Sequence, residues 1–225
     1  EDKDLWDDLE TAQQTIGYLP ENNVLYPEMT VVDYLVYSGV LHGIAKDSVL
    51  SSIKSAFDET GLNDKANSVI GTLSRGFQQW VGVAQAILHR PSVLILDEPT
   101  NYLDFSGLEW LERFLVNFNY SVMVVSHDRY FLDRVASEIW ELEHGRLQKF
   151  TGNFTKFRQL KHARVERQKI ESKRQQDFIT KEEYFIQRYM AGQRTKEAQG
   201  RLTRLNKLER IHTPEREKSI TISKI

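Results

Sequence analysis

The sequence predicts an α/β protein, with a parallel sheet covered by helices, followed by a long antiparallel helical hairpin. Two short, continuous apolar runs, Val93–Leu96 and Val122–Val125, are typical of strands buried on both faces. Residues 154–189 contain no Pro or Gly and are rich in Lys, Arg, Glu and Gln, which favours one long exposed helix. We therefore divide the chain into an α/β part over 1–150, a hairpin over 151–212 and a last segment over 213–225.

Local signals place the other elements of the α/β part in order. We expect a strand over 15–19, a helix over 30–41 after the turn at Pro27, and a helix over 48–60 that Gly61 ends. The inserts between residues 26 and 69 would form a helical subdomain. A helix over 77–89 ends before Pro91, and a helix over 107–118 separates the two apolar strands. Residues 140–147 suggest a strand and a Gly turn. This alternation favours a parallel sheet.

The hairpin is predicted to consist of helices over 154–189 and 195–211, with its tip near 191–195. Apolar residues at helical spacing suggest a coiled-coil-like seam in the second helix, at Ala198, Leu202, Leu205 and Leu208. Residues 161–210 hold 14 Lys and Arg against 7 Asp and Glu, although the whole chain has a formal charge of -2. A solvated spacer is one interpretation of such a helix pair. The excess of basic residues and the aromatic residues near the tip favour RNA contact instead. The aromatic residues are Tyr184, Phe185 and Tyr189, and the cations expected to contact RNA are Arg188, Arg194, Lys196 and Arg201.

Polar residues follow both apolar strands, at the sheet edge where ligands of parallel sheets gather. Asp97 and Glu98 end the first strand, and His127 follows the second. Adjacent carboxylates can hold Mg²⁺ and act as a general base, and a histidine can contact phosphate. Between the strands, Ser74-Arg75-Gly76 opens an amphipathic helix whose first amides suit an anion. The sequence therefore predicts a site for a nucleotide with magnesium, although acidic residues can also end core strands by chance.

These motifs resemble those of the ATP-binding-cassette (ABC) ATPases. Residues 73–77 are similar to the signature motif, 94–104 to Walker B with the D-loop, 126–132 to the H-loop, and 16–21 to the Q-loop. The resemblance implies ATP and Mg²⁺ as ligands, with Asp97 holding the metal through water and Glu21 close to it. Glu98 would polarise the attacking water, and His127 would contact the γ-phosphate. Ser74, Arg75, Gly76 and Asp104 would face a second cassette and its ATP.

The sequence also departs from this pattern. It contains no G-x-x-x-x-G-K-[ST] phosphate loop, and Arg75 stands where the signature usually has Gly. Because phosphoryl transfer depends on positioning and charge stabilisation, we expect the chain alone to bind ATP weakly and to hydrolyse it near background.

Residues 152–211 resemble the linker between the two cassettes of the ABC-F family. This implies the ribosome and tRNA as partners and makes 213–225 the start of a second cassette. The first 90 residues look more like the ATPase subunit of an ABC transporter, so a membrane transporter partner is the alternative. A non-catalytic binding module is a second alternative. The residues do not decide between a natural mosaic, a fragment and an artificial sequence.

The composition fits a cytoplasmic protein. The chain has no cysteine, no apolar run of membrane-spanning length and an acidic start without secretory character. The six histidines are scattered without the spacing of metal ligands.

Overall fold

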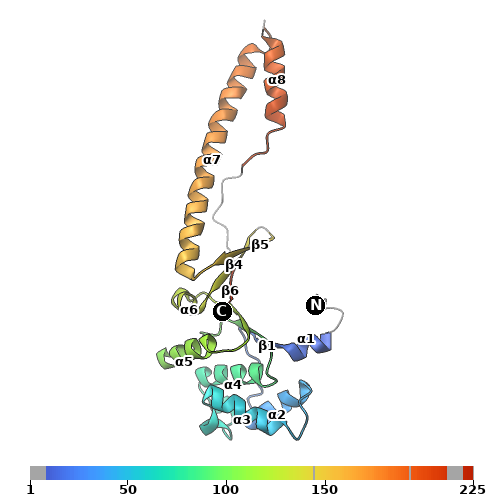
Figure 1. Cartoon of the computed structure of the whole chain (residues 1–225), viewed down its shortest axis with the longest axis vertical. Helices are drawn as coiled ribbons and strands as arrows, with labels where there is room; N and C mark the ends of the chain where they lie inside the picture. The colour runs from blue at the N-terminus through green and yellow to red at the C-terminus, as the bar shows by residue number, and fades with distance from the viewer. Residues whose placement is uncertain (1–8, 144, 193, 212–219, 225) are drawn as a thin grey trace. The chain divides into compact units, whose positions relative to one another are not determined.

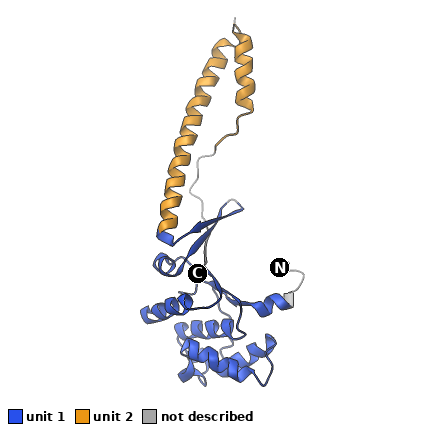
Figure 2. Ribbon diagram, in the orientation of Figure 1, with its two compact units in different colours: residues 1–155, 219–225 blue, residues 156–218 orange. Residues whose placement is uncertain are grey.

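The computed structural model describes residues 9–143, 145–192, 194–211 and 220–224, and the chain forms two compact units (Figure 2). Unit 1 comprises residues 1–155 and 219–225, and unit 2 comprises residues 156–218.

A six-stranded sheet with the order β1-β2-β3-β6-β4-β5 forms the centre of unit 1. Strands β1, β2 and β3 run parallel, as predicted. Strand β6 runs antiparallel to both of its neighbours, and β5 is antiparallel to β4. The strands are β1 (Ile16–Leu19), β2 (Val93–Asp97), β3 (Ser121–Val125), β4 (Glu138–Glu143), β5 (Arg146–Thr151) and β6 (Ile220–Lys224).

Strand β6 is the part of the predicted second-cassette segment that the structure describes. It pairs within the sheet of unit 1, between β3 and β4, and does not open a separate sheet. The physical reason is that β3 and β4 would otherwise leave facing rows of backbone donors and acceptors without partners. Residues 213–219 and 225 lie outside the described residues, so the assignment of 213–225 to a second cassette stays a prediction.

In unit 1, helices α1 and α4 pack against strand β1 of this sheet. Helices α2, α3 and α4 pack against one another (Figure 1). The predicted helices are confirmed with small shifts of their ends, whereas α1 and α6 are not predicted from the sequence. The helices are α1 (Leu9–Thr15), α2 (Val31–Leu41), α3 (Val49–Thr60), α4 (Arg75–Ile87), α5 (Phe105–Val116) and α6 (Arg129–Val135).

Side-chain caps explain where four of these helices begin. The side chains of Thr30, Ser74, Asp104 and Asp128 each accept a hydrogen bond from a backbone amide in the first turn that follows. Such caps satisfy amides that have no partner within the helix. The caps fix the starts of α4 and α5, which carry the signature and D-loop residues.

The core of unit 1 joins the helical subdomain to the sheet. Its fully buried side chains come from β1, β2, β3 and from α2, α4, α5 and α6, and include Leu19, Leu35, Val81, Leu94, Leu96, Leu111, Val124 and Phe131. No helix of the described residues is both long enough and apolar enough to cross a membrane.

Unit 2 is a helical hairpin built from α7 (Phe154–Tyr189), whose first residues belong to unit 1, and α8 (Thr195–Asn206). The predicted extent of α7 is confirmed, but the predicted end of the second helix at Ile211 is wrong. The chain after α8 is held along α7 by the Gln175 amide. Its Nε2 donates to Glu209 O at 2.8 Å, and its Oε1 accepts from Ile211 N at 2.8 Å.

The predicted seam of α8 is only partly buried. Ala198 is fully buried and Leu205 is half-buried, but Leu202 is 36% exposed. Leu208 lies beyond the end of the helix.

Candidate functional site

The predicted catalytic residues meet at one edge of the sheet, where β2 and β3 end. Asp97, the last residue of β2, is in register with Val125, the last residue of β3. The next residues therefore emerge side by side, and His127 Nε2 lies 3.6 Å from Glu98 Oε1. The strand ends thus bring Glu98 and His127 together, while their catalytic roles stay predictions.

Glu98 is only 8% exposed, and several contacts hold it in a defined position. Its backbone has a positive φ of 46°, and its amide donates to Val125 O at 2.8 Å. Its Oε2 accepts from His127 N at 3.3 Å and lies 3.5 Å from Ser126 Oγ. Its Oε1 is buried and has no hydrogen-bond donor among the described residues. A buried acceptor without a donor costs free energy, and a hydrogen bond from a water or hydroxyl that arrives with a ligand would remove that cost.

The carboxylates at this edge fit Mg²⁺ that arrives with a nucleotide. No group of three or more His, Cys, Asp and Glu among the described residues could hold a metal by itself. Mg²⁺ is usually bound by one or two carboxylates, together with water and phosphate oxygens. Asp97, which is partly exposed beside Glu98, meets that requirement. Leu19 at the end of β1 is in register with Leu96, so Glu21 follows β1 at the same edge of the sheet. Glu21 is exposed there.

The signature residues form a second group at the start of α4. Ser74 Oγ accepts from Phe77 N at 3.3 Å, so this hydroxyl caps the helix. The Arg75 guanidinium lies 5.0 Å from the centre of the Tyr102 ring. A Cβ on Gly76 would lie 3.0 Å from Tyr102 O, so the D-loop backbone approaches the helix closely at this glycine.

Asp104 completes this second group from the start of α5. Its Oδ1 accepts from Gly107 N at 2.8 Å and from Ser106 Oγ at 3.0 Å. These hydrogen bonds, first that of the Gly107 amide, hold the pKa of Asp104 below its usual value. A cavity of about 600 Å³ is lined by both helix starts, including Ser74, Arg75, Gly76, Tyr102 and Asp104.

The two groups remain separate in this chain. Among the residues that the structure describes, no hydrogen bond or ion pair joins the signature group to Asp97, Glu98 or His127.

Sequence reasoning missed two supporting residues of these groups. Tyr102 has a positive φ of 66° and carries the stacked Arg75, and Ser126 contacts both Glu98 and Asp128. Both lie inside the motifs that the sequence singles out. Their position within these motifs was the signal that could have identified them, because neither Tyr nor Ser by itself indicates a supporting role.

At the tip of the hairpin, Arg201 ties the two helices together. Its guanidinium bonds Glu182 of α7 at 2.8 Å and Glu197 of α8 at 2.9 Å. It also lies 3.9 Å from the centre of the Phe185 ring. Arg201 is thus committed to the fold of the tip, which the sequence did not reveal.

The other three predicted RNA-binding cations differ in the ion pairs and hydrogen bonds that they form. Arg194 pairs with Glu197 at 3.0 Å and lies over Tyr189 at 5.4 Å. Arg188 donates to the Tyr184 hydroxyl at 3.2 Å. Lys196 is exposed and has no ion pair or hydrogen bond within the described part of the chain.

Comparison with known proteins identifies the family in which this fold and these motifs occur. Family models described as ABC transporter match residues 1–101 and residues 140–222. The solved structure of an ATP binding subunit of an ABC transporter superposes with a TM-score of 0.59 at 25% identity, covering 66% of this chain and 64% of that one. This agrees with the parallel sheet and helical subdomain of unit 1.

Two curated relatives extend the similarity into the hairpin. ABC transporter F family member 2 of Arabidopsis thaliana is 33% identical over 78% of this chain and 26% of its own length. Energy-dependent translational throttle protein EttA of Escherichia coli K12 is 31% identical over 86% of this chain and 41% of its own length. The chain thus spans less than half the length of these relatives. The fold, the matched family models and these relatives together show that the chain belongs to the ATP-binding-cassette family and is ABC-F-like.

Proposed function

We propose that the chain couples ATP binding and hydrolysis in unit 1 to a contact between its hairpin and ribosomal RNA or tRNA. The observation that carries this proposal is the tip of unit 2. There, the ion pair of Arg201 with Glu182 and its guanidinium over the Phe185 ring hold the two helices together, and Lys196 remains available for phosphate. The name of the Escherichia coli relative, a translational throttle, supports the same partner class.

In the proposed reaction, Glu98 accepts a proton from the attacking water. Its Oε2 is held by the His127 amide, which leaves the buried Oε1 to orient that water. Asp97 would hold the metal through water, with Glu21 close to it. His127, whose side chain is 96% exposed, is free to turn towards a terminal phosphate. Mg-ATP would supply the phosphoryl group that is transferred and the metal charge that stabilises it.

A second cassette is part of this proposal. Ser74, Gly76 and Asp104 would serve ATP held by another cassette, as the resemblance of these motifs to those of the ABC ATPases implies. Because the sequence has no phosphate loop, we infer that the chain alone binds Mg-ATP weakly and turns it over near background. Isothermal titration of the chain with Mg-ATP measures this, and micromolar affinity would contradict it.

Co-sedimentation with ribosomes over a range of salt concentrations tests the RNA contact. Binding should weaken as salt rises, and Lys196→Ala should reduce the salt slope by up to about one. Lys173→Ala, which removes an exposed lysine from α7 outside the tip, is the matched control and should leave the slope unchanged. Equal slopes for the parent and Lys196→Ala would make the tip a spacer.

A second candidate function is that of the ATP-binding subunit of an ABC transporter. The solved structure that superposes on unit 1 favours it, because that protein is the ATP binding subunit of an ABC transporter. Absence of the chain from the ribosome pellet at every salt concentration would favour this candidate over the first.

A further inference from the structure

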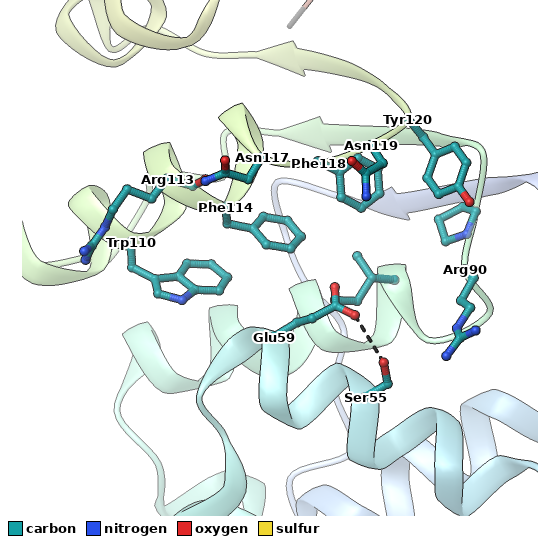
Figure 3. Close-up of a pocket in the computed structure, with 12 residues that line it drawn as sticks. Ser55, Glu59, Arg90, Trp110, Arg113, Phe114, Asn117, Phe118, Asn119 and Tyr120 are labelled. Carbon is teal, nitrogen blue, oxygen red and sulfur yellow. Dashed lines mark hydrogen bonds between the residues drawn. The ribbon is translucent and has the colours of Figure 1, made fainter.

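A cavity of about 520 Å³ in unit 1 is lined by none of the residues assigned to the nucleotide (Figure 3). Its walls come from α3, the end of α4, and the end of α5 with the turn that follows. One wall is a row of four aromatic side chains, Trp110, Phe114, Phe118 and Tyr120, with successive ring centres 5.0, 5.5 and 5.9 Å apart. The cavity therefore presents ring surface and ring edges along one wall, with Ile87 and Pro91 also in its lining.

Two arginines line the same cavity without a carboxylate partner. Arg113 Nε donates to Glu109 O at 3.2 Å, and neither Arg113 nor Arg90 forms an ion pair with any residue that the structure describes. The carboxylate of Glu59, on the facing helix α3, accepts a hydrogen bond from the Ser55 hydroxyl at 3.3 Å (Figure 3). Both guanidinium groups thus remain available for an anion.

The backbone of Arg90 gives a second, independent observation. Arg90 has a positive φ of 54° and directly precedes Pro91. The left-handed region is unfavourable for a residue with a long side chain, and a following proline restricts the backbone further. Glycine or asparagine fits this conformation at lower cost. A long cation is therefore present where the backbone favours a smaller residue, and its side chain lines the cavity.

We propose that this cavity binds an unpaired nucleotide of single-stranded RNA. Its volume falls within the range of about 300–1,000 Å³ that ligand pockets occupy. Aromatic rings and guanidinium planes stack unpaired bases, and amides such as those of Asn117 and Asn119 can bond base edges. Arg90 and Arg113 hold the adjoining phosphates. This goes beyond the proposed function, because the hairpin takes no part in it.

The test uses the full chain and a single-stranded RNA hexamer that carries 4-thiouridine. After irradiation, mass spectrometry should find cross-links in the segment 110–120. Arg90→Asn should weaken RNA binding at this segment, and Phe114→Leu should weaken it about tenfold, as expected for one lost stacking contact. Arg90→Asn should not lower the melting temperature, because asparagine tolerates the positive φ. Arg146→Asn, which removes an exposed arginine that does not line the cavity, is the matched control and should bind as the parent does.

The location of the cross-links separates this inference from the proposed function. Cross-links confined to residues 156–211 would support the hairpin contact and overturn the cavity site. Cross-links at 110–120 that persist in both Arg90→Asn and Phe114→Leu would also overturn it. Cross-links at 110–120 that Arg90→Asn removes, with an unchanged or higher melting temperature, would establish it even if the hairpin fails to bind.

Discussion

Replacing Gly82 by alanine gives a sharp test of how the Q-loop segment sits on helix α4. Alanine in a helix interior is favoured over glycine by about 1 kcal/mol. At Gly82, however, a Cβ would lie 1.9 Å from Asn23 Nδ2 and 2.7 Å from Leu19 Cδ1. Asn23 can move only by losing its bond to Gln78 O, and Leu19 is fully buried. Because overpacking costs about 1–3 kcal/mol and the helix preference offsets about 1 kcal/mol of it, we expect Gly82→Ala to lower the free energy of unfolding by up to about 2 kcal/mol.

Urea unfolding followed by tryptophan fluorescence measures this, because the described tryptophans all lie in unit 1: Trp80, Trp110 and Trp140. Gly200→Ala in α8 is the matched control, since no atom lies within 4 Å of the added Cβ. It should strengthen the far-UV helix signal of the hairpin without moving the fluorescence transition. The addition of Asn23→Ala to Gly82→Ala should recover part of the loss. Stabilisation of unit 1 by Gly82→Ala would refute the close approach of residues 19–23 to α4.

Three further predictions concern charge. In a longer protein that turns over ATP, Glu98→Gln should retain ATP binding and slow hydrolysis by at least about 100-fold, and unchanged turnover would exclude Glu98 as the base. In the hairpin, Arg201→Ala should lower the thermal midpoint of the helix signal, because it removes the ion pairs of Arg201 with Glu182 and Glu197. Lys196→Ala should leave this midpoint unchanged. Equal midpoints for the two variants would show that Arg201 does not stabilise the hairpin. Burial lowers the pKa values of the stacked His42 and His89 from 6.5, so protonation favours the unfolded chain. Their contribution to stability should be complete above about pH 6.5 and decline below it, and His42→Phe should reduce this decline. A free energy of unfolding that responds to pH identically in parent and His42→Phe would contradict the assignment.

The sequence predicted the elements whose signals are local. Apolar runs bounded by polar residues located β2 and β3, and the period and stop signals located α2, α3 and α4. Because β2 and β3 are parallel neighbours, the residues after them had to meet at one edge, which brought Glu98 beside His127. The composition of residues 154–189 predicted the bounds of α7, since an unbroken run of good helix formers needs no tertiary partner to be recognised.

Contacts between residues far apart in the chain were decided only by the tertiary structure. Strand β6 lies between β3, almost 100 residues earlier in the chain, and β4, about 80 residues earlier. The segment after α8 is bonded to Gln175, which is 34 and 36 residues before its partners Glu209 and Ile211. The stacking of Arg75 on Tyr102 and the tie made by Arg201 likewise need two segments to meet. A sequence pattern records the local preference of each residue, but the free energy of these contacts arises only once folding brings both partners together.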